Sequence, residues 1–238
     1  MLLEVKDLNT YYGESHVLQN MSLAVDQGEL VALLGRNGMG KSTTLKSIMG
    51  LVKPKSGTVI YKGKDIAGYP PYKVCRAGIG YVAEERRIFP NLSVLDNLAM
   101  GIKGGKIKEP DNPDVWTVDR IFKHFPMLKE RANQKGVLLS GGEQQMLSIS
   151  RSLMGNPELL MVDEPTEGLA PLLVKEVRDM LENINKAGVS ILFVEHNLKV
   201  AMSLADRVYL MGKAHLGFTG TVEDLEAKPE IREKYLEV

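Results

Sequence analysis

The sequence predicts an α/β fold, and two kinds of pattern along the chain indicate it. Short uninterrupted apolar runs at 30–34, 159–162 and 191–194 have the composition of parallel strands buried on both faces. Helical patterns occupy 41–49 and 171–187, between these runs. Because strands that alternate with helices are typical of parallel sheets, we expect one α/β core.

The N-terminal segment predicts a different kind of sheet. Apolar and polar residues alternate over 3–8 and 17–25, which is typical of antiparallel strands with one face in solvent. A turn at 26–28 separates these strands from the first apolar run. We therefore expect an antiparallel β subdomain beside the parallel core.

The middle of the chain has helical and loop patterns instead. Ser93-Val-Leu-Asp96 is a capping-box sequence that begins a helix, and 103–114 is a connection rich in glycine, proline and charge. We expect a single domain over 1–238, with an inserted helical subdomain at 85–155 and an α/β core formed by 1–84 and 156–238.

The C-terminal part returns to the α/β pattern. After His196 we expect a helix, two short strands within 207–218 and a final helix from about Val222. Thr221 begins that last helix in the form Ser/Thr-x-x-Asp/Glu.

Composition limits the class of protein. The chain has 238 residues, and 44% of them are hydrophobic, which is enough for one sizeable buried core. Thirty Lys and Arg residues balance thirty Asp and Glu residues, so no excess positive charge is present to hold nucleic acid or an anionic membrane surface. We therefore expect no nucleic-acid partner.

Three features favour a cytoplasmic location. Cys75 is the only cysteine, which fits a reducing compartment. Residues 1–13 lack the basic and apolar regions of a signal peptide. Every apolar run is shorter than the roughly 18 to 20 residues that span a bilayer, so we expect that the chain does not cross a membrane by itself.

A phosphate-binding motif joins the apolar run at 30–34 to the helix at 41–49. It has the form Gly-x-x-x-x-Gly-Lys-Ser, and its strand and helix context lets backbone N–H groups converge on a phosphate. Lys41 is expected to bind the β- and γ-phosphates of a nucleoside triphosphate, and Ser42 to bind Mg²⁺. The candidate binding residues of this motif are Gly35, Arg36, Asn37, Gly38, Met39, Gly40, Lys41, Ser42 and Thr43.

Two carboxylates follow the buried run at 159–162. The C-terminal edge of a parallel sheet is where such folds bind ligands, so Asp163 and Glu164 are expected near the phosphates. Asp163 would hold Mg²⁺ through water, and Glu164 would polarise the water that attacks the γ-phosphate. Taken alone, these residues also fit a solvated acidic turn before Pro165.

Two further side chains are candidates for nucleotide contacts. His196 follows the strand at 190–195 and would lie beside the γ-phosphate by the same argument, although a lone histidine is also compatible with a structural role. Tyr12, in a Tyr-Tyr-Gly turn, could stack on adenine, because an aromatic face suits a nucleobase. The alternative for Tyr12 is packing at a strand edge.

The segment 139–145, Leu-Ser-Gly-Gly-Glu-Gln-Gln, is a second phosphate-binding device. A Ser-Gly-Gly turn that opens a helix directs free N–H groups outward, yet one nucleotide needs only one P-loop. Two half-sites on one chain therefore predict that two chains work together. The candidate residues are Ser140, Gly141, Gly142 and Glu143.

In the order GRNGMGKST, LSGGEQQ, LLMVDEP and EHN, these motifs resemble the nucleotide-binding subunit of an ATP-binding cassette (ABC) transporter over essentially the whole chain. The resemblance implies a RecA-like P-loop NTPase core, ATP and Mg²⁺ as cofactors, and ATP hydrolysis coupled to transport. It also implies two subunits packed head to tail, so that Ser140, Gly141 and Gly142 contact the γ-phosphate held by the partner chain. The family's D-loop would fall at 167–170, where its usual aspartate is absent.

A narrower resemblance comes from YVAEERRIFP at 81–90 and EPTEGLAPLLV at 164–174. Together with LSGGEQQMLSISRSLM, these segments are similar to the smaller ATPase of the branched-chain amino acid uptake systems. Related subfamily members serve urea, amides or aromatic acids. Glu84 stands where most of the superfamily has glutamine, near the expected Mg²⁺. A carboxylate there would bind the cation more strongly and would repel the γ-phosphate. The alternative is that Glu84 is a displaced acidic residue at the surface.

The resemblance also implies partners and a place in the cell. It implies a second ATP-binding subunit, identical or paralogous, together with membrane-spanning permease subunits and indirectly a periplasmic or extracellular substrate-binding protein. The chain would lie at the cytoplasmic face of the membrane, held by the permeases.

Other classes of ABC protein fit the sequence less well. The interval between Lys41 and Leu139 is too short for the coiled coil of an ABC DNA-repair ATPase. An ABC translation factor would be expected to have a second cassette and a basic arm, and this sequence has neither. A regulatory module without catalysis would tolerate loss of Glu164 or His196, and both are present.

Overall fold

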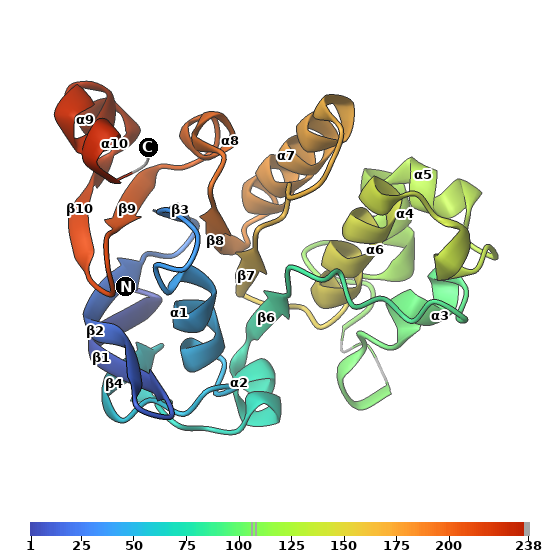
Figure 1. The fold of residues 1–238 in the computed structure, drawn as a ribbon. Coiled ribbons are helices and arrows are strands. Elements are labelled where there is room, and N and C mark those ends of the chain that lie inside the picture. Colours follow the sequence, from blue (N-terminus) through green and yellow to red (C-terminus); the bar gives the residue numbers. More distant parts are fainter. Residues whose placement is uncertain (106, 108, 236–238) are drawn as a thin grey trace.

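The computed structural model describes residues 1–105, 107 and 109–235. Its centre is a six-stranded sheet with the order β10-β9-β3-β8-β7-β6 (Figure 1). Five of these strands run parallel, and only β10 pairs antiparallel, at the β9 edge. The strands are β3 (Leu30–Leu34), β6 (Ile79–Val82), β7 (Leu159–Asp163), β8 (Ser190–Glu195), β9 (Arg207–Met211) and β10 (Leu216–Thr221).

A second, antiparallel sheet is built mostly from the N-terminal segment, as its alternating pattern predicts. The order is β2-β1-β4-β5. The first two strands extend beyond the predicted ranges because they meet in a tight hairpin in which Tyr12 pairs with Ser15. The strands are β1 (Leu3–Tyr12), β2 (Ser15–Val25), β4 (Ser56–Tyr61) and β5 (Lys64–Asp65).

Helices cover the central sheet and gather beside its β6 edge. Figure 1 shows α1 between the two sheets, α7 over β7 and β8, and α3 to α6 grouped away from the N-terminal sheet. The α-helices are α1 (Lys41–Ile48), α2 (Pro71–Ala77), α3 (Val94–Ala99), α4 (Val118–His124), α5 (Pro126–Glu130), α6 (Gly141–Leu153), α7 (Pro171–Lys186), α8 (Leu198–Met202), α9 (Val222–Glu226) and α10 (Pro229–Tyr235), and the two short 3₁₀ turns are η1 (Lys103–Gly105) and η2 (Gly136–Leu138). Among the described residues, no helix is both long enough and apolar enough to span a bilayer.

The uninterrupted apolar strands are buried because both faces of the central sheet are covered. Side chains alternate between the faces of a strand, so β3 supplies Ala32 and Leu34 to one core and Val31 and Leu33 to the other. The first core packs against α6 and α7, and the second packs against α1 and the antiparallel sheet. The predicted α/β fold class is confirmed.

The C-terminal segment departs from its predicted bounds. β10 extends to Thr221, beyond the expected limit at Phe218, and the single final helix is divided into α9 and α10. Thr221 caps α9 with a reciprocal capping box to Asp224, as its sequence predicts. Pro229 lacks an N–H and cannot continue the first helix, so the second helix begins there.

Candidate functional site

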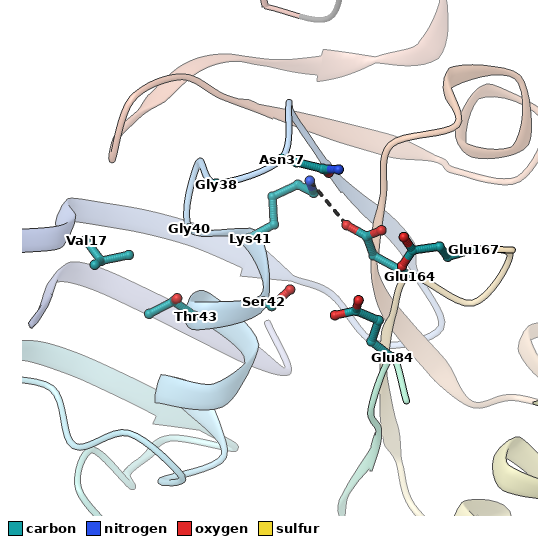
Figure 2. Close-up of a pocket in the computed structure, with 10 residues that line it drawn as sticks. All are labelled: Val17, Asn37, Gly38, Gly40, Lys41, Ser42, Thr43, Glu84, Glu164 and Glu167. Carbon is teal, nitrogen blue, oxygen red and sulfur yellow. Dashed lines mark ion pairs between the residues drawn. The ribbon is translucent and has the colours of Figure 1, made fainter. Parts of the chain in front are cut away.

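The loop between β3 and α1 forms one wall of an open cavity at the C-terminal edge of the central sheet. Gly40 caps α1 with φ of 100°, and Gly38 has φ of 80°, a region that side-chain-bearing residues rarely adopt. A Cβ at Gly38 would meet no atom within 4 Å, so this part of the loop faces open space. The cavity has a volume of about 400 Å³ (Figure 2), and its lining residues are Val17, Asn37, Gly38, Gly40, Lys41, Ser42, Thr43, Glu84, Glu164 and Glu167.

Lys41 is buried, with only 3% of its side chain exposed. Its Nζ donates to the carbonyl oxygens of Gly35 at 2.9 Å and Arg36 at 3.2 Å. The same ammonium lies 3.4 Å from Oε1 of Glu164, a pair marked in Figure 2. A buried ammonium needs such partners, and all of them are groups that phosphate oxygens could replace.

Asp163 is fully buried at the end of β7 and is held from two sides. Ser42 Oγ donates to its Oδ1 at 2.8 Å, and the hydroxyl of Tyr81 donates to its Oδ2 at 3.1 Å. Burial raises the pKa of the Asp163 carboxyl, against the opposing effect of these two hydrogen bonds. Burial, together with the negative charge of Asp163, also raises the pKa of the Tyr81 hydroxyl, which therefore stays a donor.

Glu164 connects the P-loop to the end of β8. It has φ of 46°, unusual for a residue with a side chain, and its backbone N–H donates to the carbonyl of Val194 at 3.0 Å. Its Oε2 lies 2.9 Å from Nδ1 of His196, whose side chain is 42% exposed. The structure therefore brings Lys41, Glu164 and His196 into one line of contacts.

Glu195, which the sequence did not single out, is a fully buried carboxylate behind this line. Its Oε2 accepts a hydrogen bond of 2.6 Å from Thr166 Oγ1, and its Oε1 accepts the backbone N–H groups of His196 and Asn197, each at 2.9 Å. Nδ1 of His196 lies 3.5 Å from the same Oε1. The one signal in the sequence is an acid at the end of an apolar run.

Two more carboxylates lie beside the cavity. Figure 2 shows Glu84 and Glu167 next to Glu164, across from Lys41 and Ser42. Glu84 comes from the segment after β6, and Glu167 from the loop before α7. Burial, and then the negative charge of Glu164 and a hydrogen bond to Glu84, raise the pKa of the Glu167 carboxyl. A cation, or a phosphate ligand that brings a metal ion with it, would reduce the repulsion among these three carboxylates.

The predicted metal donors Ser42, Asp163 and Glu84 come from α1, β7 and the segment after β6. In residues 1–105, 107 and 109–235, no group of three or more His, Cys, Asp or Glu side chains forms a ready-made metal cage. Mg²⁺ usually keeps several waters and takes phosphate oxygens with one or two protein ligands. The Ser42 hydroxyl, hydrogen-bonded to the Asp163 carboxylate and lining the cavity, fits the coordination that Mg²⁺ prefers.

Tyr12 lies at the tip of the β1–β2 hairpin and is 47% exposed. It does not line the cavity at the P-loop, but Val17 of the neighbouring strand does. Val17 was not predicted, because an isolated valine in a strand carries no functional signal. The ring of Tyr12 is exposed, and its predicted contact with adenine stays a prediction.

The turn at 139–142 lies at the start of α6, and none of its residues lines the P-loop cavity of the same chain. Ser140 caps the helix, accepting a hydrogen bond from the N–H of Glu143, whose carboxylate accepts from the N–H of Ser140 at 2.6 Å. The other oxygen of Glu143 pairs with Arg131 at 2.6 Å. The N–H groups of Gly141 and Gly142 belong to the first turn of α6 and precede the first helical hydrogen bonds.

Comparisons with known proteins agree with this geometry. A family model described as ABC transporter matches residues 18–167. The chain is 39% identical to the high-affinity branched-chain amino acid transport ATP-binding protein BraG of Pseudomonas aeruginosa, over 99% of both chains. It is 31% identical to the lipopolysaccharide export system ATP-binding protein LptB of Haemophilus influenzae, over 99% of this chain and 97% of that protein.

Solved structures show the same fold. The ADP conformation of MJ1267, an ATP-binding cassette of an ABC transporter, superposes with a TM-score of 0.84 at 26% identity, over 98% of this chain and 97% of that chain. The dimeric structure of MJ0796, a bacterial ABC transporter cassette, superposes with a TM-score of 0.78 at 26% identity, over 93% of this chain and 99% of that chain.

Proposed function

The chain belongs to the ABC transporter family, and from this premise we propose that it is the ATP-hydrolysing subunit of an importer for branched-chain amino acids. It is an ATPase of the ATP-binding cassette type. The contacts that join Lys41, Glu164 and His196 beside the P-loop cavity carry the catalytic part of the proposal. The cargo rests on the similarity to BraG.

In the proposed complex, the loop Gly35–Thr43 holds the phosphates of ATP through its N–H groups and the end of α1. Lys41 exchanges the carbonyls of Gly35 and Arg36 for the β- and γ-phosphate oxygens. The ring of Tyr12 stacks on adenine. Mg²⁺, held by Ser42, Asp163 and Glu84, would neutralise the charge that develops on the phosphate oxygens.

Glu164 is the proposed general base. Once Lys41 turns to the phosphates, Oε1 of Glu164 is released and can accept a proton from the attacking water. The water oxygen bonds to the γ-phosphorus as the bond to ADP breaks, and the proton remains on Glu164. With a proton on each ring nitrogen, His196 would donate from Nδ1 to the other carboxylate oxygen and from Nε2 to the γ-phosphate.

Ser140, Gly141, Gly142 and Glu143 belong to the partner's site in this proposal. Two chains, identical or paralogous, face each other so that each α6 points its N-terminus at the other chain's ATP. The proposed helical subdomain at 85–155 transmits closure of the dimer to membrane-spanning permeases at the cytoplasmic face. A periplasmic or extracellular binding protein delivers the cargo to those permeases.

Deletion of the gene in its own organism tests the cargo. We expect uptake of radiolabelled leucine, isoleucine and valine to fall, and plasmid-borne wild type to restore it while Glu164→Gln does not. Unchanged uptake of all three amino acids would contradict the import proposal. If lipopolysaccharide transport to the cell surface failed instead, the function would follow LptB, to which the chain is also similar.

A further inference from the structure

We propose that Arg86 is an additional γ-phosphate contact that acts in trans, on the ATP bound to the partner chain. The inference rests on the proposed two-chain function and extends it, because Arg86 has no part in the motifs that define the two half-sites. It follows from the position, the charge and the backbone of this side chain.

The guanidinium of Arg86 lies against the turn that opens α6. A Cβ built on Gly141 would be 2.9 Å from Nη1 and 3.4 Å from both Cζ and Nη2 of Arg86. The absence of a side chain at Gly141 therefore leaves the space in which this guanidinium lies. The same turn carries the free N–H groups of Gly141 and Gly142, which are the proposed γ-phosphate donors.

The positive charge of Arg86 lies where an anion would be favoured. The N-terminus of α6 is the positive end of a helix, and a cation placed there is repelled. The nearby carboxylate of Glu143 is already taken by Ser140 and Arg131. Among the described residues Arg86 has no ion-pair partner, whereas its neighbour Arg87 pairs with Glu85 at 3.0 Å.

The backbone holds Arg86 in this place by an unusual turn. Arg86 has φ of 60° and Arg87 has φ of 43°, and the N–H of Arg86 donates to the carbonyl of Ala83 at 3.2 Å. Arg151 of α6 donates to the carbonyl of Arg87 at 2.8 Å, which ties the turn to the helix. Left-handed conformations in two successive residues with side chains are costly and need such support.

One short segment thus serves two sites. Glu84 lines the P-loop cavity of its own chain, whereas Arg86 does not line it and lies against Gly141, in the turn that we propose faces the partner. In the two-chain arrangement, three phosphate oxygens would meet the N–H groups of α6 and a planar guanidinium. Such a pairing is the geometry that arginine supplies and lysine does not.

The first test compares Arg86→Ala with Arg87→Ala as a matched control. We expect Arg86→Ala to lower kcat about 10- to 100-fold, the usual effect of losing one charge-assisted phosphate contact, with little change in KM. Arg86→Lys should recover only part of the loss, and Arg87→Ala should stay near wild type. Equal rates for Arg86→Ala and wild type would overturn the proposal.

The second test separates cis from trans action in dimers purified through two different tags. A Lys41→Ala chain paired with wild type leaves one working site, which uses the P-loop of the wild-type chain. Adding Arg86→Ala to the Lys41→Ala chain should lower the remaining rate as much as in the first test. Placing Arg86→Ala in the chain with the intact P-loop should leave the rate unchanged, and the reverse pattern would overturn trans action.

The proposed function is checked in the same preparation. Glu164→Gln should form a stable dimer with ATP by size-exclusion chromatography. If it stays monomeric, the two-chain function fails, and the role of Arg86 fails with it. If it dimerises but Arg86→Ala changes neither kcat nor the mixed-dimer rates, only the role of Arg86 fails.

Discussion

At the scale of single residues, Glu164 is held between the side chains of Lys41 and His196. Lys41 lies 3.4 Å from one carboxylate oxygen and Nδ1 of His196 lies 2.9 Å from the other. In the proposed role of Glu164 as general base, one of its oxygens is occupied until phosphate draws Lys41 away. The proposal therefore expects activation of water only after the nucleotide is bound.

Replacing Glu164 by Gln should abolish most hydrolysis and keep ATP binding. The amide retains the size of the side chain but accepts no proton, so we expect kcat to fall about 10²- to 10⁴-fold. Phosphate release and equilibrium binding of a fluorescent ATP analogue measure the two effects. Hydrolysis at the parental rate would show that another group is the base.

The buried carboxyl group of Glu195 has hydrogen-bond donors for both of its oxygens. It accepts from Thr166 and from the N–H groups of His196 and Asn197. The loop before α7 and the segment that carries His196 are therefore linked through one side chain.

Two substitutions at Glu195 distinguish its shape from its charge. Glu195→Ala leaves one buried and two partly buried donors without their acceptor, so we expect the free energy of unfolding to fall by about 2 to 4 kcal/mol. Glu195→Gln still accepts the two N–H groups and can donate to Thr166, so its loss should stay below about 1 kcal/mol. Urea unfolding measures both, and equal losses would show that the charge dominates.

At the scale of elements, the segment after β6 is anchored by helices on both sides. Asn97 of α3 is fully buried; its Oδ1 accepts the N–H of Phe89 at 2.8 Å, and its Nδ2 donates to the carbonyls of Phe89 and Ser93 at 3.0 and 2.9 Å. Arg151 of α6 binds the carbonyl of Arg87 and stacks over the ring of Phe89 at 5.1 Å. Arg87 and Phe89, directly after Glu84 and Arg86, are therefore tied to both helices.

Asn97→Ala should loosen this anchor. It removes several buried hydrogen bonds of about 1 kcal/mol each, so we expect the free energy of unfolding to fall by about 2 to 4 kcal/mol. Hydrogen exchange at 87–93 should become faster than in wild type. Asn183→Ala, on the exposed face of α7, is the control and should stay within about 0.5 kcal/mol. Unchanged exchange at 87–93 in Asn97→Ala would contradict the anchoring role.

At the scale of the whole molecule, the two proposed phosphate-binding segments of the chain do not meet. The P-loop cavity contains no residue of the turn at 139–142, and that turn opens a helix on the far side of β6 (Figure 1). In the proposed function each half-site supplies what the other lacks, so completion of either site would need a second chain.

The rate of hydrolysis per chain should therefore depend on protein concentration. At concentrations below the dimer dissociation constant, we expect specific ATPase activity to rise nearly in proportion to concentration and then to level off. Measurements over a hundredfold dilution series, with sedimentation in parallel, would follow this change. A specific activity that is constant across the series, with monomers throughout, would contradict the two-chain site.

The sequence alone was sufficient to locate the features that depend on neighbouring residues along the chain. The P-loop, the acids at the end of β7 and the capped turn before α6 are each specified by neighbours along the chain, since a strand followed by a glycine loop and a helix determines where N–H groups point. The apolar runs also predicted β3, β7 and β8, because burial on both faces leaves a continuous pattern. The division into subdomains and the roles of the site residues remain predictions of the same origin.

Only the tertiary structure decided which distant residues meet. Tyr81 reaches Asp163 across 82 positions of sequence, and Thr166 reaches Glu195 across 29. Arg86 lies against Gly141 only because α6 packs beside the segment after β6. Such contacts depend on how strands are ordered in the sheet and on how closely two backbones approach. The local pattern of apolar and polar residues depends on neither of these, so it does not single out the residues that make such contacts.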